Sequence, residues 1–130
     1  MQALVFWAWH SPALYSSALS DHAVYWLMQV SLVGAAVGFW SVLRRAPAPA
    51  AVAALLATMV QMGLLGALIT FSATPLYEPH FESAFRWGFD PLEDQQLGGL
   101  IMWAPTAGVY LAAALAVAGN WLSRETRIAG

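Results

Sequence analysis

The hydropathy pattern of the 130-residue chain is dominated by three long stretches without charge. They cover residues 24–43, 50–72 and 97–122. An α-helix needs about 20 apolar residues to cross the hydrocarbon core of a bilayer, which is roughly 30 Å thick. The pattern therefore predicts an all-α integral membrane protein whose three transmembrane helices form a single membrane domain.

A shorter apolar segment precedes the first of these stretches. Ala3 to Trp9 would span only about 10 Å as a helix, and Pro12 is expected to stop it. Two interpretations stay open. The segment is the end of a helix whose beginning is missing, or it is an interfacial helix whose aromatic side chains lie among the lipid headgroups. The aromatic residues concerned are Phe6, Trp7, Trp9 and Tyr15.

The third uncharged stretch follows the only long polar segment, the predicted loop 74–96. Asp94 is suited to begin the third helix, because its carboxylate can accept hydrogen bonds from the free N–H groups of the first turn. Pro105 lies inside the stretch and removes one backbone hydrogen bond, so a kink is predicted beside it.

Glycines mark places where helices are expected to approach one another. Gly34 and Gly38 have the small-xxx-small spacing that lets two membrane helices pack closely. Gly98 and Gly99 expose backbone one turn after Asp94, where a helix or a ligand can approach. The first pair indicates packing and not chemistry.

Composition excludes several classes of protein. With 60% hydrophobic and 9% charged residues, the chain has far fewer charges than a soluble domain, in which about a quarter of residues are charged. It contains no Lys and no basic patch, so no nucleic-acid partner is expected. The absence of Cys rules out disulfides and thiolate metal sites. No nucleotide-binding or catalytic motif is present, so we expect neither catalysis nor a small-molecule substrate.

The arginines predict the orientation of the chain in the membrane. Four of the five fall on one side of a three-span arrangement; these are Arg44, Arg45, Arg124 and Arg127. The positive-inside rule then places the N-terminus outside, the C-terminus in the cytoplasm and the loop 74–96 outside. All three histidines consequently lie on the outer side.

These histidines are candidate metal ligands. His10, His22 and His80 come from three separate segments, and Met102 is expected slightly more than one turn below the outer surface. Imidazole binds several transition metals, and thioether sulfur selects Cu(I), so the combination favours copper. No two histidines have the i,i+4 spacing that would place them on one helix face. The alternative therefore stays open that each histidine satisfies a backbone carbonyl or lies among the headgroups.

One block of sequence resembles a known family. Leu92 to Trp103, LEDQQLGGLIMW, followed by Pro105, is similar to the entry of a late transmembrane helix in the CtaG family of cytochrome c oxidase assembly factors. The phrases Trp9 to Tyr15 (WHSPALY) and Thr74 to Tyr77 (TPLY) fit the family in the same order. The block contributes the motif residues Asp94, Gln95, Gly98, Gly99 and Trp103. The resemblance covers nearly the whole chain and the C-terminal half of the family.

The resemblance implies a function. It predicts a non-enzymatic, multi-pass protein of the bacterial inner membrane that assists copper delivery or insertion into a haem-copper oxidase from the periplasmic side. Its partners would be oxidase subunits. Copper would be held by His10, His80 and Met102, together with His22, which the outer-face argument supports and the motif does not. The alternative is an accessory subunit of a respiratory oxidase that has a structural role and no metal. Its glycine pairs would then be packing faces for a partner helix.

Overall fold

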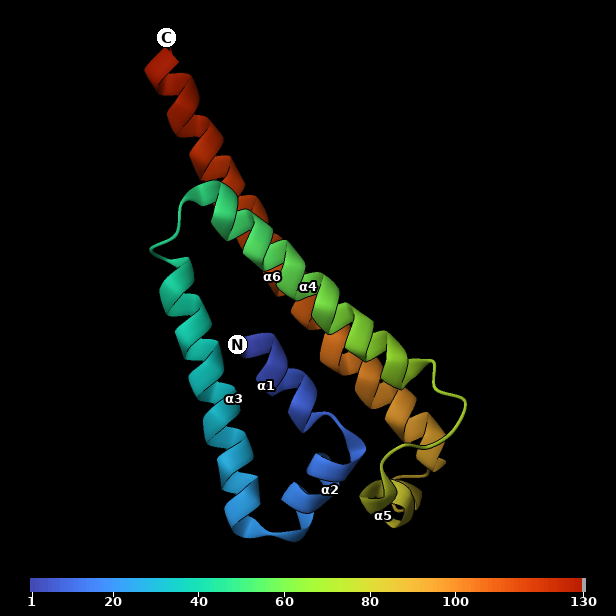
Figure 1. The fold of residues 1–130 in the computed structure, drawn as a ribbon. Helices are drawn as coiled ribbons and strands as arrows, with labels where there is room; N and C mark the ends of the chain where they lie inside the picture. The colour runs from blue at the N-terminus through green and yellow to red at the C-terminus, as the bar shows by residue number, and fades with distance from the viewer. Residues whose placement is uncertain (130) are drawn as a thin grey trace.

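The computed structural model describes residues 1–129, which are helical apart from short turns and parts of the segment that joins the two longest helices (Figure 1). The elements are α1 (Gln2–Trp9), α2 (Pro12–Ser20), α3 (His22–Leu43), α4 (Ala48–Thr70), the 3₁₀ turn η1 (Glu78–His80), α5 (Phe81–Phe85) and α6 (Pro91–Ala129). Three of them, α3, α4 and α6, are long and apolar enough to cross a membrane. The predicted all-α membrane architecture with three such helices is confirmed.

The ends of α3 and α6 show how local sequence sets helix boundaries. At the start of α3 the Asp21 carboxylate accepts hydrogen bonds from the N–H groups of Ala23 (2.7 Å) and Val24 (3.1 Å). This is the expected cap of a free helix N-terminus. Asp21 therefore starts the helix two residues before the uncharged stretch begins.

Helix α6 starts earlier than the pattern predicts. Pro91 occupies its first position, where a proline has no N–H to lose. The Asp90 carboxylate accepts from the N–H of Leu92 (2.9 Å), and the Glu93 carboxylate accepts from the N–H of Asp90 (3.0 Å). These reciprocal bonds form a capping box. The prediction that Asp94 begins the helix is wrong, and its carboxylate is left free for another role.

Helix α6 is also longer than its predicted span. Its 39 residues extend over about 58 Å, and Figure 1 shows its C-terminal end projecting beyond the turn between α3 and α4. The helix continues through Pro105 without interruption, and the kink expected there stays a prediction. The Thr106 hydroxyl donates to the Met102 carbonyl (2.6 Å) on the turn beside the proline.

Helices α4 and α6 form the central pair of the fold and lie side by side along the whole of α4 (Figure 1). Leu55 of α4 is fully buried in their core. Gly99 brings the two backbones together, because a Cβ there would lie 2.6 Å from Thr70 Oγ1. Gly66 is covered by the indole of Trp103, and a Cβ at Gly66 would overlap that ring.

The other glycine pair has a different environment. A Cβ at Gly34 or at Gly38 would meet nothing within 4 Å, so neither residue serves a helix contact inside this chain. Helix α3 contacts α1 and α2 much more than it contacts α4 or α6. The two glycines thus form an open stripe on α3.

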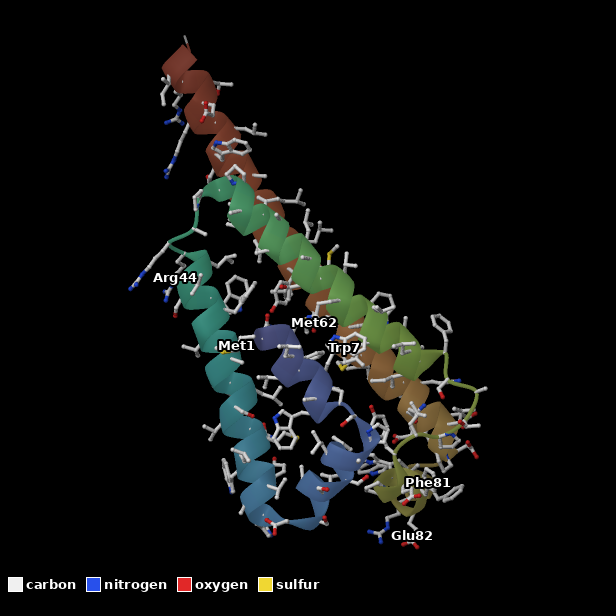
Figure 2. The ribbon with its side chains drawn as sticks, viewed as in Figure 1. Met1, Trp7, Arg44, Met62, Phe81 and Glu82 are labelled. Atoms are coloured by element: carbon white, nitrogen blue, oxygen red, sulfur yellow. The ribbon has the colours of Figure 1, made fainter. Side chains whose placement is uncertain are left out.

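Helix α1 lies inside the bundle, between α3 and the α4–α6 pair (Figure 1). The Trp7 indole N–H donates to Gln61 Oε1 (2.6 Å), and the Trp9 indole N–H donates to Ser31 Oγ (2.8 Å). Gln61 and Ser31 are near the middle of α4 and α3, and Figure 2 shows Trp7 close to Met62 in the interior. The interfacial interpretation is therefore wrong for these two tryptophans, because their N–H groups have partners within the bundle.

The segment after α1 packs against α3. As predicted, the first helix stops before Pro12: α1 ends at Trp9, and Pro12 occupies the first turn of a separate helix, α2, whose Ala18 is buried. Helix α2, η1 and α5 together cover one end of the bundle. Figure 2 shows Phe81 and Glu82 at this end and Arg44 at the opposite one.

Candidate functional site

A cavity of about 370 Å³ lies at the end of the bundle that α2 and η1 cover. Its polar walls are the side chains of His10, Tyr15, Tyr77, His80, Asp94 and Gln95. Its remaining surface is apolar or bare backbone, supplied by Ile69, Leu97, Gly98, Gly99, Ile101 and Met102. The cavity thus joins a polar rim to an apolar floor.

The cavity brings together three parts of the sequence that are far apart. The phrase Trp9 to Tyr15 gives His10 and Tyr15, and Thr74 to Tyr77 gives a second tyrosine. The block Leu92 to Trp103 gives the floor and the carboxylate. Phrases that resemble one family in order along the chain are therefore adjacent in space.

His10 presents one ring nitrogen to a neighbour and keeps the other free. Its Nδ1 lies 2.7 Å from the Phe6 carbonyl oxygen. Because a carbonyl can only accept, Nδ1 carries the hydrogen and the lone pair of the neutral ring is on Nε2. Burial lowers the pKa of His10, and the bond to Phe6 opposes that effect. The ring is therefore neutral at pH 7, as metal coordination requires.

His80 is held by Tyr15. Its Nε2 lies 2.9 Å from the Tyr15 hydroxyl, and the two ring centroids are 5.6 Å apart. Tyr15 in turn packs edge-on against Tyr77, with centroids 5.0 Å apart. The Tyr77 hydroxyl donates to the His10 carbonyl (2.7 Å). This network joins the α1–α2 turn to η1.

Both cavity tyrosines stay protonated. Burial raises the pKa of Tyr15, and the negative charge of Asp94 raises it further. Burial also raises the pKa of Tyr77, with a smaller contribution from Tyr15. Two neutral phenols can each donate and accept a hydrogen bond. They therefore act here as fixed hydrogen-bonding walls.

Gln95, on α6, holds the end of α4 and the segment that follows α4. Its side chain is buried, its Oε1 accepts from the Leu76 N–H (2.5 Å), and its Nε2 donates to the Ile69 carbonyl (3.2 Å) and, at 3.5 Å, to Thr74. The chain between α4 and η1 is consequently clamped over the cavity. The sequence placed Gln95 in a motif but gave no role for it.

The structure separates the four candidate metal ligands into two groups. His10, His80 and Met102 line the cavity. His22 is exposed at the start of α3, in a separate depression with Asp21 and Tyr25. Within residues 1–129, no three His, Cys, Asp or Glu side chains are grouped as a metal site. The cavity lining itself contains two imidazoles, the Met102 thioether and the Asp94 carboxylate.

Two cavity residues were missed by sequence reasoning. Tyr15 was considered as an interfacial aromatic and as the end of a supporting phrase, and Tyr77 only as part of another such phrase. Both belong to the phrases that carry the family resemblance, and that signal was sufficient to include them. Asp94 lines the cavity instead of capping α6.

The fold and the cavity define a multi-pass α-helical membrane protein with a site of imidazole, phenol and thioether groups at one end. The sequence model of the family described as cytochrome c oxidase caa3 assembly factor matches residues 1–124. The chain belongs to this family, which confirms the resemblance seen in the motif block. Comparisons with curated proteins and with solved structures found no match. Membership in the family indicates a role in oxidase assembly and an oxidase-related partner. It also favours a non-catalytic role for this chain.

Proposed function

We propose that this protein assists cytochrome c oxidase assembly by holding copper, as Cu(I), in the cavity and passing it to an oxidase subunit. The observation that carries the proposal is the meeting of His10, His80 and Met102 at one cavity. They come from three separate segments of the chain. Two imidazoles and a thioether form a donor set that suits Cu(I) better than the harder Mg²⁺ or Ca²⁺.

The arrangement of donors supports a cargo site. Nε2 of His10 is free in the neutral ring, because Nδ1 is bonded to Phe6. A metal-binding histidine commonly has its second nitrogen fixed by a carbonyl in this way. Copper carried here would be substrate, bound to be given up, and no reaction is catalysed by the chain itself.

The charge distribution supports delivery from the outer side. Arg44 and Arg45 follow α3, and Arg124 and Arg127 lie near the end of α6. The cavity is lined by His80 of η1, next to Phe81, and Figure 2 shows Phe81 at the end of the bundle opposite Arg44. By the positive-inside rule the arginine-rich end is cytoplasmic. In the bacterial inner membrane the cavity then faces the periplasm.

Copper retention by the detergent-solubilised protein tests the proposal. After loading with Cu(I) and desalting, the unaltered protein retains copper, and His10→Ala/His80→Ala loses most of it. His22→Ala is the matched control, because His22 lies outside the cavity; it retains copper like the unaltered protein. Equal copper in the unaltered protein and the double variant would remove the site.

One observation favours a second function, that of a metal-free accessory subunit. The stripe formed by Gly34 and Gly38 has open space around it and is available for a partner helix. This function predicts co-purification with oxidase subunits in fixed stoichiometry and without bound copper. Gly34→Leu/Gly38→Leu would then abolish co-purification, whereas the cavity variants would not.

A further inference from the structure

The two cavity histidines are held in complementary ways. His10 is fixed through Nδ1, by the Phe6 carbonyl at 2.7 Å. His80 is fixed through Nε2, by the Tyr15 hydroxyl at 2.9 Å. In each ring one nitrogen is hydrogen-bonded to the protein, and the other remains available to a ligand. The nitrogens left for a ligand are Nε2 of His10 and Nδ1 of His80.

We infer that Tyr15 is a positioning residue that makes His80 bind Cu(I) through Nδ1, with the Nε2–H of His80 donated to the Tyr15 oxygen. The inference rests on the proposed function. It adds which ring nitrogens coordinate the ion and which residue orients the His80 ring. Metal-bound histidines commonly donate their second N–H to a fixed acceptor, which sets the tautomer and the ring orientation. Tyr15 is the group in position to do this for His80.

The surroundings of Tyr15 suit this task. Its ring is packed edge-on against Tyr77, and a half-buried phenol held by a neighbouring ring has little freedom to turn away. A neutral phenol oxygen retains a lone pair to accept from an imidazole N–H.

The substitution Tyr15→Phe tests the inference with little change of shape. It keeps the ring packed against Tyr77 and removes only the oxygen. We expect the dissociation constant for Cu(I), measured by competition with a colorimetric Cu(I) chelator, to rise on the order of 10- to 100-fold. Tyr25→Phe is the control, since Tyr25 lies on α3 outside the cavity; its dissociation constant is unchanged.

A spectroscopic measurement separates positioning from a general loss of structure. The chain has three histidines, so ¹⁵N-histidine labelling gives two ring-nitrogen signals for each, and Cu(I) is diamagnetic. In the unaltered protein, Cu(I) should shift Nδ1 of His80 and Nε2 of His10, while Nε2 of His80 keeps its proton. In Tyr15→Phe the His80 signals change even without metal, and those of His22 do not.

The possible outcomes are distinct. A Cu(I) dissociation constant in Tyr15→Phe that is equal to or below that of the unaltered protein would overturn the inference alone. Coordination of His80 through Nε2 would do the same. If the unaltered protein binds no Cu(I), the proposed function fails, and this inference fails with it.

Discussion

At the scale of single residues, two neighbouring acids show how small shifts in position change a role. Asp90 caps α6 by accepting from the Leu92 N–H, and Asp94, one turn later, lines the cavity. Both carboxylates precede an apolar helix in the sequence, and either is a good capping residue. Pro91 decides between them, because a proline is favoured at the first helical position.

Gln95 is the residue whose loss we expect to loosen the cavity wall most. Gln95→Leu keeps the volume but leaves the Leu76 N–H and the Ile69 carbonyl without their partner. An unsatisfied buried group costs about 1–3 kcal/mol, so the thermal midpoint in detergent should fall. Cleavage of the segment between α4 and α6 by protease should become faster.

The neighbouring Gln96 provides the control for that experiment. Its side chain makes none of the three bonds of the clamp, so Gln96→Leu should change the thermal midpoint and the cleavage rate little. If Gln95→Leu behaves like Gln96→Leu, the clamp does not hold the segment.

At the scale of elements, the close approach of α4 and α6 depends on Gly99. A Cβ there would lie 2.6 Å from Thr70 Oγ1 and 3.1 Å from the Thr70 backbone nitrogen, which cannot move aside as a side chain can. Gly99→Ala should therefore destabilise the protein by about 1–3 kcal/mol through overpacking. Unfolding of the detergent-solubilised protein with increasing SDS measures the difference.

Gly108 lies on the same helix in open space, because a Cβ there would meet nothing within 4 Å. Gly108→Ala should be neutral or stabilise α6 by up to about 1 kcal/mol, since alanine is the better helix former. If both substitutions stabilise the protein equally, the two helices are not in close contact at Gly99.

Elements also show what sequence can and cannot predict. The three long helices follow from runs of uncharged residues. The place of α1 does not, because Ala3 to Trp9 is apolar on all sides and fits a bundle interior as well as an interface. Only the bonds from Trp7 to Gln61 and from Trp9 to Ser31 decide it, and these join residues far apart in the chain.

The candidate site was predictable to a similar extent. Ligand chemistry and the outer-face argument selected His10, His80 and Met102, which meet at the cavity. The same argument selected His22, which shares their side of the chain but lies in a different depression. That two residues lie on the same membrane face fixes only their positions along the axis of the bundle. Distance across the bundle depends on helix packing, which a single sequence does not give.

At the scale of the whole molecule, the orientation in the membrane can be tested directly. The chain contains no Cys, so a single introduced cysteine is a unique reporter. Glu82→Cys lies near the cavity end and Ser123→Cys near the arginine-rich end, and both positions are exposed. In intact cells a membrane-impermeant maleimide should label position 82 and leave position 123 unlabelled.

Permeabilised cells serve as the control for labelling, since both cysteines should react once the reagent reaches each side. Labelling of position 123 and not of position 82 in intact cells would reverse the orientation. Delivery of copper from the periplasmic side would then be excluded, whatever the cavity binds.

The packing of the helices gives the cavity one further property. Helices α1 and α2 pack mainly on α3, whereas α6 packs along α4, and the cavity lies where these two groups of helices meet. Side-chain hydrogen bonds join the two groups, from Trp7 to Gln61, from Tyr77 to the His10 carbonyl and between Tyr15 and His80. The shape of the cavity therefore depends on these few cross-links as well as on the packing of each helix pair.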